Sequence, residues 1–172
     1  MKNLLILISF LYISPQLFGQ IDSNFIFTKM SAKDSIDFNP FWNQFKSNIF
    51  NSDTSEIRLK SLQFTKCDIC TNSESEYLSI DSLLLNIIPS LKSSPLWSAI
   101  QQNRINLKKR RQQNSDKKIT PKGYGDLLTT YEVWIQTYKP NEFAAGHEGQ
   151  SHCFQFIRHN DNFKLFGITS IP

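Results

Sequence analysis

The spacing of apolar residues changes partway along the chain, and this change constrains the fold more than any other feature. Before residue 104 the apolar residues recur at helical spacing, whereas after residue 126 they alternate with polar ones. Alternation is typical of strands that bury one face. Helices first and antiparallel strands last predict an α+β domain, with the helices packed on one face of a curved antiparallel sheet.

The clearest helix is the segment "FNPFWNQFKSNIF", whose apolar residues fall on a single stripe. Asn39 is placed to cap this helix, and Pro40 suits its first position. We expect Trp42, Phe45 and Ile49 to face the core. Three further helices are expected: from Asp53 or Thr54 to near Phe64, over residues 77–91 with a break around Pro89, and from Pro95 onward.

Three strands are expected, over residues 129–138, 151–159 and 163–171. In the second of these, His152, Phe154 and Phe156 share one face, while Cys153 points to the other. The apolar residues of the last strand switch faces after Leu165. This switch predicts a bulge near Gly167.

The first twenty residues resemble a secretory signal peptide. An early Lys2 precedes a short apolar run from Leu4 to Ile13, and Ser14 and Pro15 follow. The run is too short for a spanning helix, and no later run is long enough. We therefore expect cleavage after about residue 20. Residues 21–172 would then form one soluble domain, exported to the periplasm or the cell exterior.

The basic residues of the chain are concentrated between residues 104 and 122. This segment holds eight Lys or Arg and one acid, so the rest of the chain is net acidic although the whole carries +4. The segment predicts a mobile, solvated loop. It lacks the interleaved aromatic residues of single-strand binders, so we expect no nucleic-acid partner. Weak contact with anionic lipid headgroups or polysaccharide stays open.

The chain has three cysteines, and two of them form the motif "CDIC". A disulfide between Cys67 and Cys70 is expected in an exported protein, leaving Cys153 buried and free. A redox centre would need the motif at a helix start after a buried strand. A zinc site would add two of His147, His152 and Cys153, but the last two point to opposite faces of a strand. We expect no metal and no cofactor.

Two segments resemble a known family. The opening "FNPFWNQFKSNIFNSDTSEIRLKSLQF" and the close "CFQFIRHNDNFKLFGITSI" are similar to the first helices and the last hairpin of exported bacterial domains in the NTF2-like (SnoaL-like) superfamily. Phe163 stands where those domains often have Trp. The related cystatin fold is the alternative. The resemblance implies a cone-shaped pocket between the long helix and the curved sheet.

No catalytic motif of that family's enzymes matches this chain, so we assign no catalytic residue. The favoured function is binding of a small apolar ligand or a protein partner in the cone, without catalysis. The alternative is a small hydrolase- or isomerase-like enzyme in which His152 pairs with Asp126 or Glu132. The candidate pocket residues are Trp42, Phe45, Tyr131, His152, Phe154 and Phe156.

Overall fold

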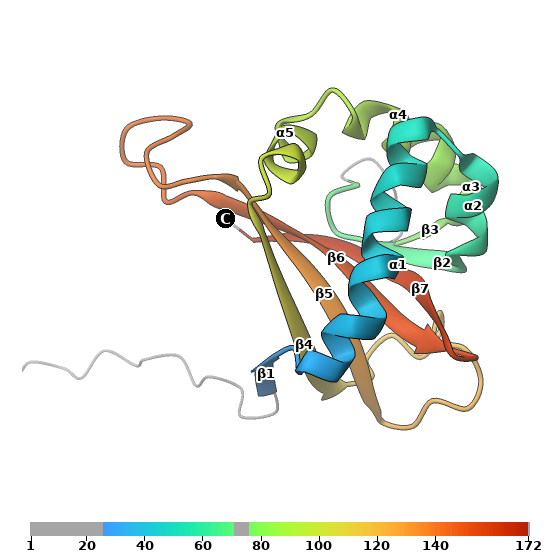
Figure 1. Ribbon diagram of the computed structural model, residues 1–172. Coiled ribbons are helices and arrows are strands. Elements are labelled where there is room, and N and C mark those ends of the chain that lie inside the picture. Colours follow the sequence, from blue (N-terminus) through green and yellow to red (C-terminus); the bar gives the residue numbers. More distant parts are fainter. Residues whose placement is uncertain (1–25, 71–75, 172) are drawn as a thin grey trace, which may run out of the picture.

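The computed structural model describes residues 26–70 and 76–171 (Figure 1). The expected signal peptide lies outside the described residues. In chain order the elements are β1 (Ile26–Lys29), α1 (Ala32–Asn51), α2 (Thr54–Leu59), β2 (Ser61–Cys67), β3 (Tyr77–Ser79), α3 (Ile80–Ser82), the π-helical segment η1 (Leu83–Ile87), α4 (Ile88–Leu91), α5 (Pro95–Gln101), β4 (Ile105–Gln113), β5 (Leu127–Tyr138), β6 (Gln150–His159) and β7 (Asn162–Ile171).

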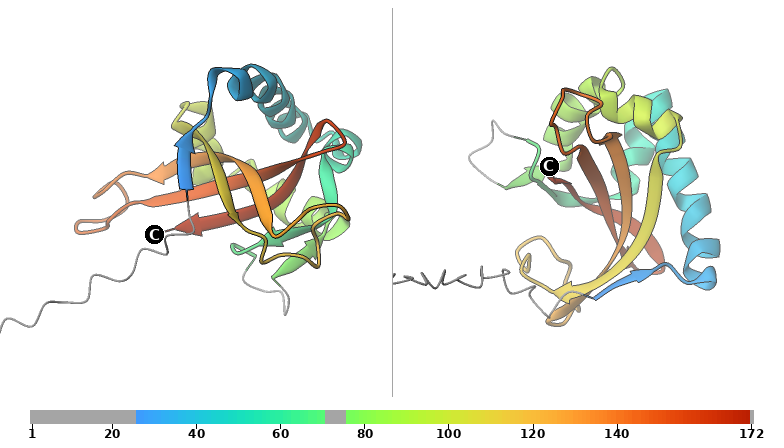
Figure 2. Two further views of the ribbon diagram at one scale, coloured as in Figure 1. Left: turned by 90° about the horizontal axis from the view of Figure 1, so that it is seen from below. Right: turned by 90° about the vertical axis from the view of Figure 1, so that its left-hand side faces the viewer.

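The strands form one seven-stranded sheet in the order β1-β4-β5-β6-β7-β2-β3. All neighbours are antiparallel except β2 and β7, which run parallel. Within the described residues β1 and β3 are the two edges, so the sheet is open. It is twisted and curved, and α1 runs across one of its faces (Figures 1 and 2). The predicted α+β class is confirmed at this level.

The long helix α1 starts earlier than the sequence pattern indicated. Ser31, not Asn39, is its N-cap, and the Ser31 hydroxyl accepts a hydrogen bond from the backbone N–H of Asp34 at 3.1 Å. Pro40 lies inside the helix instead of at its first position. The prediction was wrong because a proline interrupts only one backbone hydrogen bond, and the buried stripe of the helix supplies enough packing to continue past it.

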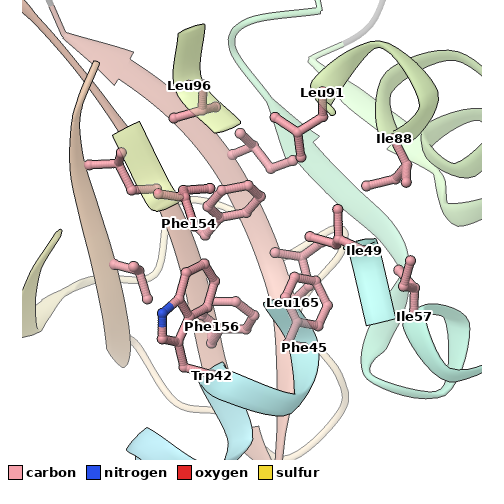
Figure 3. Close-up of a cluster of buried hydrophobic side chains, with 14 of the residues drawn as sticks. Trp42, Phe45, Ile49, Ile57, Ile88, Leu91, Leu96, Phe154, Phe156 and Leu165 are labelled. Atoms are coloured by element: carbon pink, nitrogen blue, oxygen red, sulfur yellow. The ribbon is translucent and has the colours of Figure 1, made fainter. Parts of the chain in front are cut away.

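The predicted packing of α1 on the sheet is confirmed. Phe45 and Ile49 are fully buried, and Trp42 is nearly so. Phe45 meets Phe156 edge to face, with ring centroids 5.2 Å apart, and the Trp42 ring lies 5.8 Å from that of Phe154 (Figure 3). Such aromatic pairs add to the stabilisation that burial alone gives.

Two of the other predicted helices end or begin differently. Helix α2 stops at Leu59 instead of near Phe64, because residues 61–67 pair as strand β2 with both β3 and β7. Residues 77–79 form β3, and an unbroken helical run follows over 80–91. The predicted break around Pro89 is therefore absent. Instead η1 widens the helix just before it, with the N–H of Ile88 donating to the carbonyl of Leu83. The helix predicted after Pro95 is confirmed as α5.

The basic segment is not a mobile loop over its first half, where the structure places strand β4. The cationic stretch 108–111 pairs with β1 on one side and with β5 on the other. A strand places alternate side chains on opposite faces, and on each face a carboxylate pairs with one of these cationic side chains. Lys109 Nζ contacts both carboxylate oxygens of Asp34 at 3.0 and 3.1 Å, and Arg110 Nε lies 3.2 Å from the carboxylate of Glu132. Only residues 114–126 form a connection without regular structure.

The predicted bulge in the last strand is confirmed. Gln155 pairs with Gly167 and the next residue of β6, Phe156, pairs with Leu165, so Phe166 has no partner in the register. Phe166 turns to the other face of the sheet, where it joins a second buried cluster with Leu62, Leu128 and Ile157. Because of this bulge, β7 contributes Leu165 to the core on one face of the sheet and Phe166 to the cluster on the other.

Candidate functional site

A cavity of about 380 Å³ lies between the turn that joins α4 to α5 and the adjoining ends of β5 and β6. This volume is within the range of small-molecule sites. Its walls are mainly apolar, with a few polar groups. The lining residues are Ile69, Ile87, Ser90, Leu91, Ser94, Pro95, Leu96, Thr137, Tyr138, Gln150 and His152.

The helical wall of this cavity is built by a local capping arrangement. Ser94 caps α5 by accepting the N–H of Trp97 at 3.2 Å, and its hydroxyl donates to the carbonyl of Leu91 at the end of α4. Pro95 takes the first helical position, where its missing N–H costs nothing. These contacts fix the turn between the two helices. Leu91 and Leu96, on either side of the turn, point back into the core (Figure 3).

The strand wall contains a second bulge, which the sequence did not reveal. Gln136 pairs with Ser151 and Tyr138 pairs with Gln150, so Thr137 is the extra residue of β5. The Thr137 hydroxyl and Nδ1 of His152 are 2.6 Å apart and share one hydrogen bond. Bulges re-aim side chains near functional sites, and this one brings the threonine beside the histidine in the cavity wall.

His152 is half-buried, and this burial lowers the pKa of its imidazole below the ordinary value. The ring is therefore neutral at pH 7. It contributes a hydrogen bond to the cavity without a charge. The site thus combines apolar walls with one uncharged polar pair, His152 and Thr137.

Only one of the six predicted pocket residues lines this cavity. His152 does so, whereas the other five are buried in the hydrophobic core: Trp42, Phe45, Tyr131, Phe154 and Phe156. Their rings pack against α1 and against each other, and this part of the expected cone is filled. The strand pattern gives the face of a side chain, but it does not tell whether a neighbour fills the space beside it.

The structure does not assemble the expected acid–histidine pair. Glu132 lies opposite Gln155 in the register and so on the other face of the sheet from His152. Asp126 is exposed and pairs with Lys117 at 2.7 Å. Neither carboxylate is placed to take a proton from the imidazole.

Glu132 instead anchors a polar cluster on the outer face of the sheet. Its fully buried carboxylate accepts hydrogen bonds from Trp134 Nε1 at 2.7 Å and Gln155 Nε2 at 3.3 Å, and it lies against Arg110. Such extensive hydrogen bonding is how a folded chain tolerates a buried charge. We interpret this cluster as structural.

The two cysteines of "CDIC" lie within disulfide-bonding distance, as predicted, with Cα atoms 5.4 Å apart. Ile69, between them, lines the cavity, so a disulfide here would hold one wall in place. Cys153 is buried and free, on the opposite face from His152. His147 lies in the β5–β6 connection and accepts the N–H of Gly149. Across the described residues, no three metal-ligating side chains come together.

None of the helices in the described part of the chain is long and apolar enough to cross a membrane. Comparison with known proteins gives no match to a family model, to a curated protein or to a solved structure.

Proposed function

We propose that this chain is an exported, non-catalytic binding domain of the NTF2-like kind, and that the cavity beside His152 holds a small, mainly apolar ligand. One observation carries this proposal. The lining surface of the cavity is mainly apolar, and its polar side chains include a hydrogen-bonded pair, His152 with Thr137. Apolar walls with a few convergent polar groups are the usual composition of small-molecule sites.

Binding without catalysis is favoured by the surroundings of the histidine. The partner of its Nδ1 is a hydroxyl, and the two acids that could have formed a general base with it lie elsewhere. A neutral imidazole bonded to a threonine suits recognition of a polar atom on a ligand. The long helix across a curved sheet supports the NTF2-like assignment, with the cystatin fold as the alternative. The cysteine pair supports export.

A matched pair of substitutions tests the site. Gln150 lines the cavity, whereas the next residue, Ser151, points to the other face of the sheet. Gln150→Trp should fill the mouth and weaken binding of an uncharged naphthyl probe by at least about tenfold, equivalent to 1.4 kcal/mol. Ser151→Trp adds the same side chain outside the cavity and should leave binding unchanged. Equal binding by both variants, with melting temperatures like that of the parent, would place the site elsewhere.

A further inference from the structure

A second, polar cavity adjoins the first, and we infer from the pair that the ligand is an uncharged single-chain amphiphile. Its chain would lie in the apolar cavity, and its hydroxyl- or amide-bearing head in the second cavity, here called the polar annex. This inference rests on the proposed function and names the ligand class that the site takes.

The polar annex has a volume of about 300 Å³ and shares four lining residues with the apolar cavity: Ser94, Pro95, Thr137 and Tyr138. Its other lining residues are Ser93, Ser98, Ala99, Gln102, Arg104 and Glu142. The annex therefore lies along α5, on the side where the β5–β6 connection projects past the end of the sheet (Figure 1). The shared walls show that the two cavities adjoin, and in our proposal one ligand extends over both, with its apolar end in one and its polar end in the other.

The polar annex contains both signs of charge, and they neutralise each other. Arg104 donates from both terminal nitrogens to the carboxylate of Glu142, each at 2.8 Å. That hydrogen bonding to Arg104 lowers the pKa of Glu142, so the carboxylate stays ionised at neutral pH. One carboxylate oxygen also accepts the N–H of Lys139 at 2.6 Å. A bidentate pair of this kind is strong and geometrically specific.

Arg104 and Glu142 pair with each other, so neither of them offers an unpaired charge to an ionic head group in the polar annex. A carboxylate head would have to displace Glu142 from Arg104, and an ammonium head would have to displace Arg104. Either exchange separates Arg104 from Glu142, and because Glu142 is exposed and water solvates the charge that is left, the charged ligand is disfavoured only modestly. A head with hydroxyl or amide groups can hydrogen-bond to the serine hydroxyls and to Gln102 without that penalty.

Thr137 lies at the junction of the two cavities and uses its two polar groups in opposite directions. Its hydroxyl contacts His152 in the apolar cavity, and its carbonyl accepts a hydrogen bond from Arg104 at 3.4 Å. The bulge at this residue therefore connects the apolar wall to the annex ion pair. A ligand whose polarity changes at one point along its length matches this arrangement.

The first experiment compares ligands with one alkyl chain and different heads, below their micelle-forming concentrations. Decanol, monodecanoylglycerol and decanoate each displace the naphthyl probe from the full chain at pH 8. We expect monodecanoylglycerol to bind about tenfold more tightly than decanol, and decanoate to bind about threefold more weakly than monodecanoylglycerol, as the rupture of an exposed ion pair implies. Decanoate binding as tightly as the neutral glycerol ester would overturn the inference.

The second experiment fills the polar annex. Ser98 is exposed on α5 and lines the annex, whereas Gln44 is exposed on α1 and lines neither cavity. Ser98→Trp should reduce affinity for monodecanoylglycerol to that for decanol and leave decanol binding unchanged, and Gln44→Trp should alter neither. If Ser98→Trp leaves the difference between the two ligands intact, the annex does not hold the head. If no ligand binds the parent protein, the proposed function fails as well.

The third experiment reverses the charge preference. Glu142→Gln keeps an oxygen that accepts hydrogen bonds but leaves the Arg104 charge without its partner. The variant should bind decanoate about threefold more tightly than the parent does, with little change for monodecanoylglycerol. Unchanged decanoate affinity would show that the ion pair does not select the head group.

Discussion

The imidazole of His152 is held uncharged by its surroundings, and this is the main chemical property of the site at the scale of single residues. The ring lies in the wall of a mainly apolar cavity, and its Nδ1 shares a hydrogen bond with the Thr137 hydroxyl. Burial without an acidic partner is the condition under which a histidine loses affinity for its proton. A carboxylate in place of the threonine would raise the pKa of the imidazole and make it a stronger base.

The lowered pKa of His152 predicts a loss of stability on mild acidification. In the unfolded chain the histidine ionises at about 6.5, whereas the folded protein takes up the proton only at lower pH. Between these two values the unfolded state binds more protons, so the free energy of unfolding should fall as pH drops below about 6.5. Urea unfolding at a series of pH values should show this slope in the parent and a smaller slope in His152→Gln.

A direct measurement checks the same point. The ring proton shifts of His152 in an NMR titration should give a midpoint below 6.5. A His152 midpoint above 6.5 would mean that an acid reaches the ring, and the catalytic alternative would then regain support.

At the scale of secondary-structure elements, α1 supplies one half of the aromatic core. Trp42→Ala should lower the free energy of unfolding by about 3–5 kcal/mol, because it removes a buried ring that packs on Phe154. Asn43→Ala, one residue along and exposed, should change it by no more than about 0.5 kcal/mol. Denaturant unfolding of both variants measures the difference. Equal midpoints for the two variants would contradict the packing of α1 on the sheet.

Strand β4 predicts a specific pattern of proteolysis. Trypsin needs an extended, unpaired backbone, and residues 108–111 are paired on both sides, with β1 and with β5. Within residues 104–122 we therefore expect the first cuts after Lys117, Lys118 or Lys122, all of them exposed. Mass spectrometry of an early time point identifies the sites. A first cut inside 108–111 would show that the basic stretch is a loop after all.

The elements that sequence reasoning found and missed differ in the range of their contacts. The stripe of α1 and the alternation of β5, β6 and β7 are local patterns, and both were predictable. Strand β2 was missed because its partner β7 lies about a hundred residues along the chain, so nothing local indicates the pairing. Strand β4 was missed because its charges resemble those of a solvated loop until the acids that receive them are placed in space.

The candidate site was predictable only in part for the same reason. His152 was identified because its strand face follows from alternation. Thr137 was not, because the end of β5 shows no switch of apolar residues from one face to the other, the signal that marked the bulge in β7. Leu91 and Leu96 carried a helical signal, but that signal does not tell a cavity wall from a filled core.

At the scale of the whole molecule, the sheet separates two environments. Its helix-covered face holds the aromatic core and, at one end, the cavity; its other face holds the Glu132 cluster and the thiol of Cys153. Because strands β5 and β6 contribute to both faces, a rigid outer cluster also fixes the strand wall of the site. The strand wall of the proposed site thus belongs to the same two strands as a buried polar network on the opposite face.

The buried thiol offers a measure of how firmly this arrangement holds. Cys153 is completely buried in the middle of β6, and burial together with the negative charge of Glu132 raises its pKa well above the ordinary value. A buried, protonated thiol reacts only when the structure opens.

In the non-reduced protein we therefore expect no rapid alkylation under native conditions, one alkylation at Cys153 in denaturant, and three after reduction. The native rate should rise in Trp42→Ala, since a weaker core increases the opened population on both faces of the sheet. Rapid native alkylation of Cys153 in the parent would mean that the outer face is open, and three alkylations before reduction would mean that Cys67 and Cys70 are not bonded.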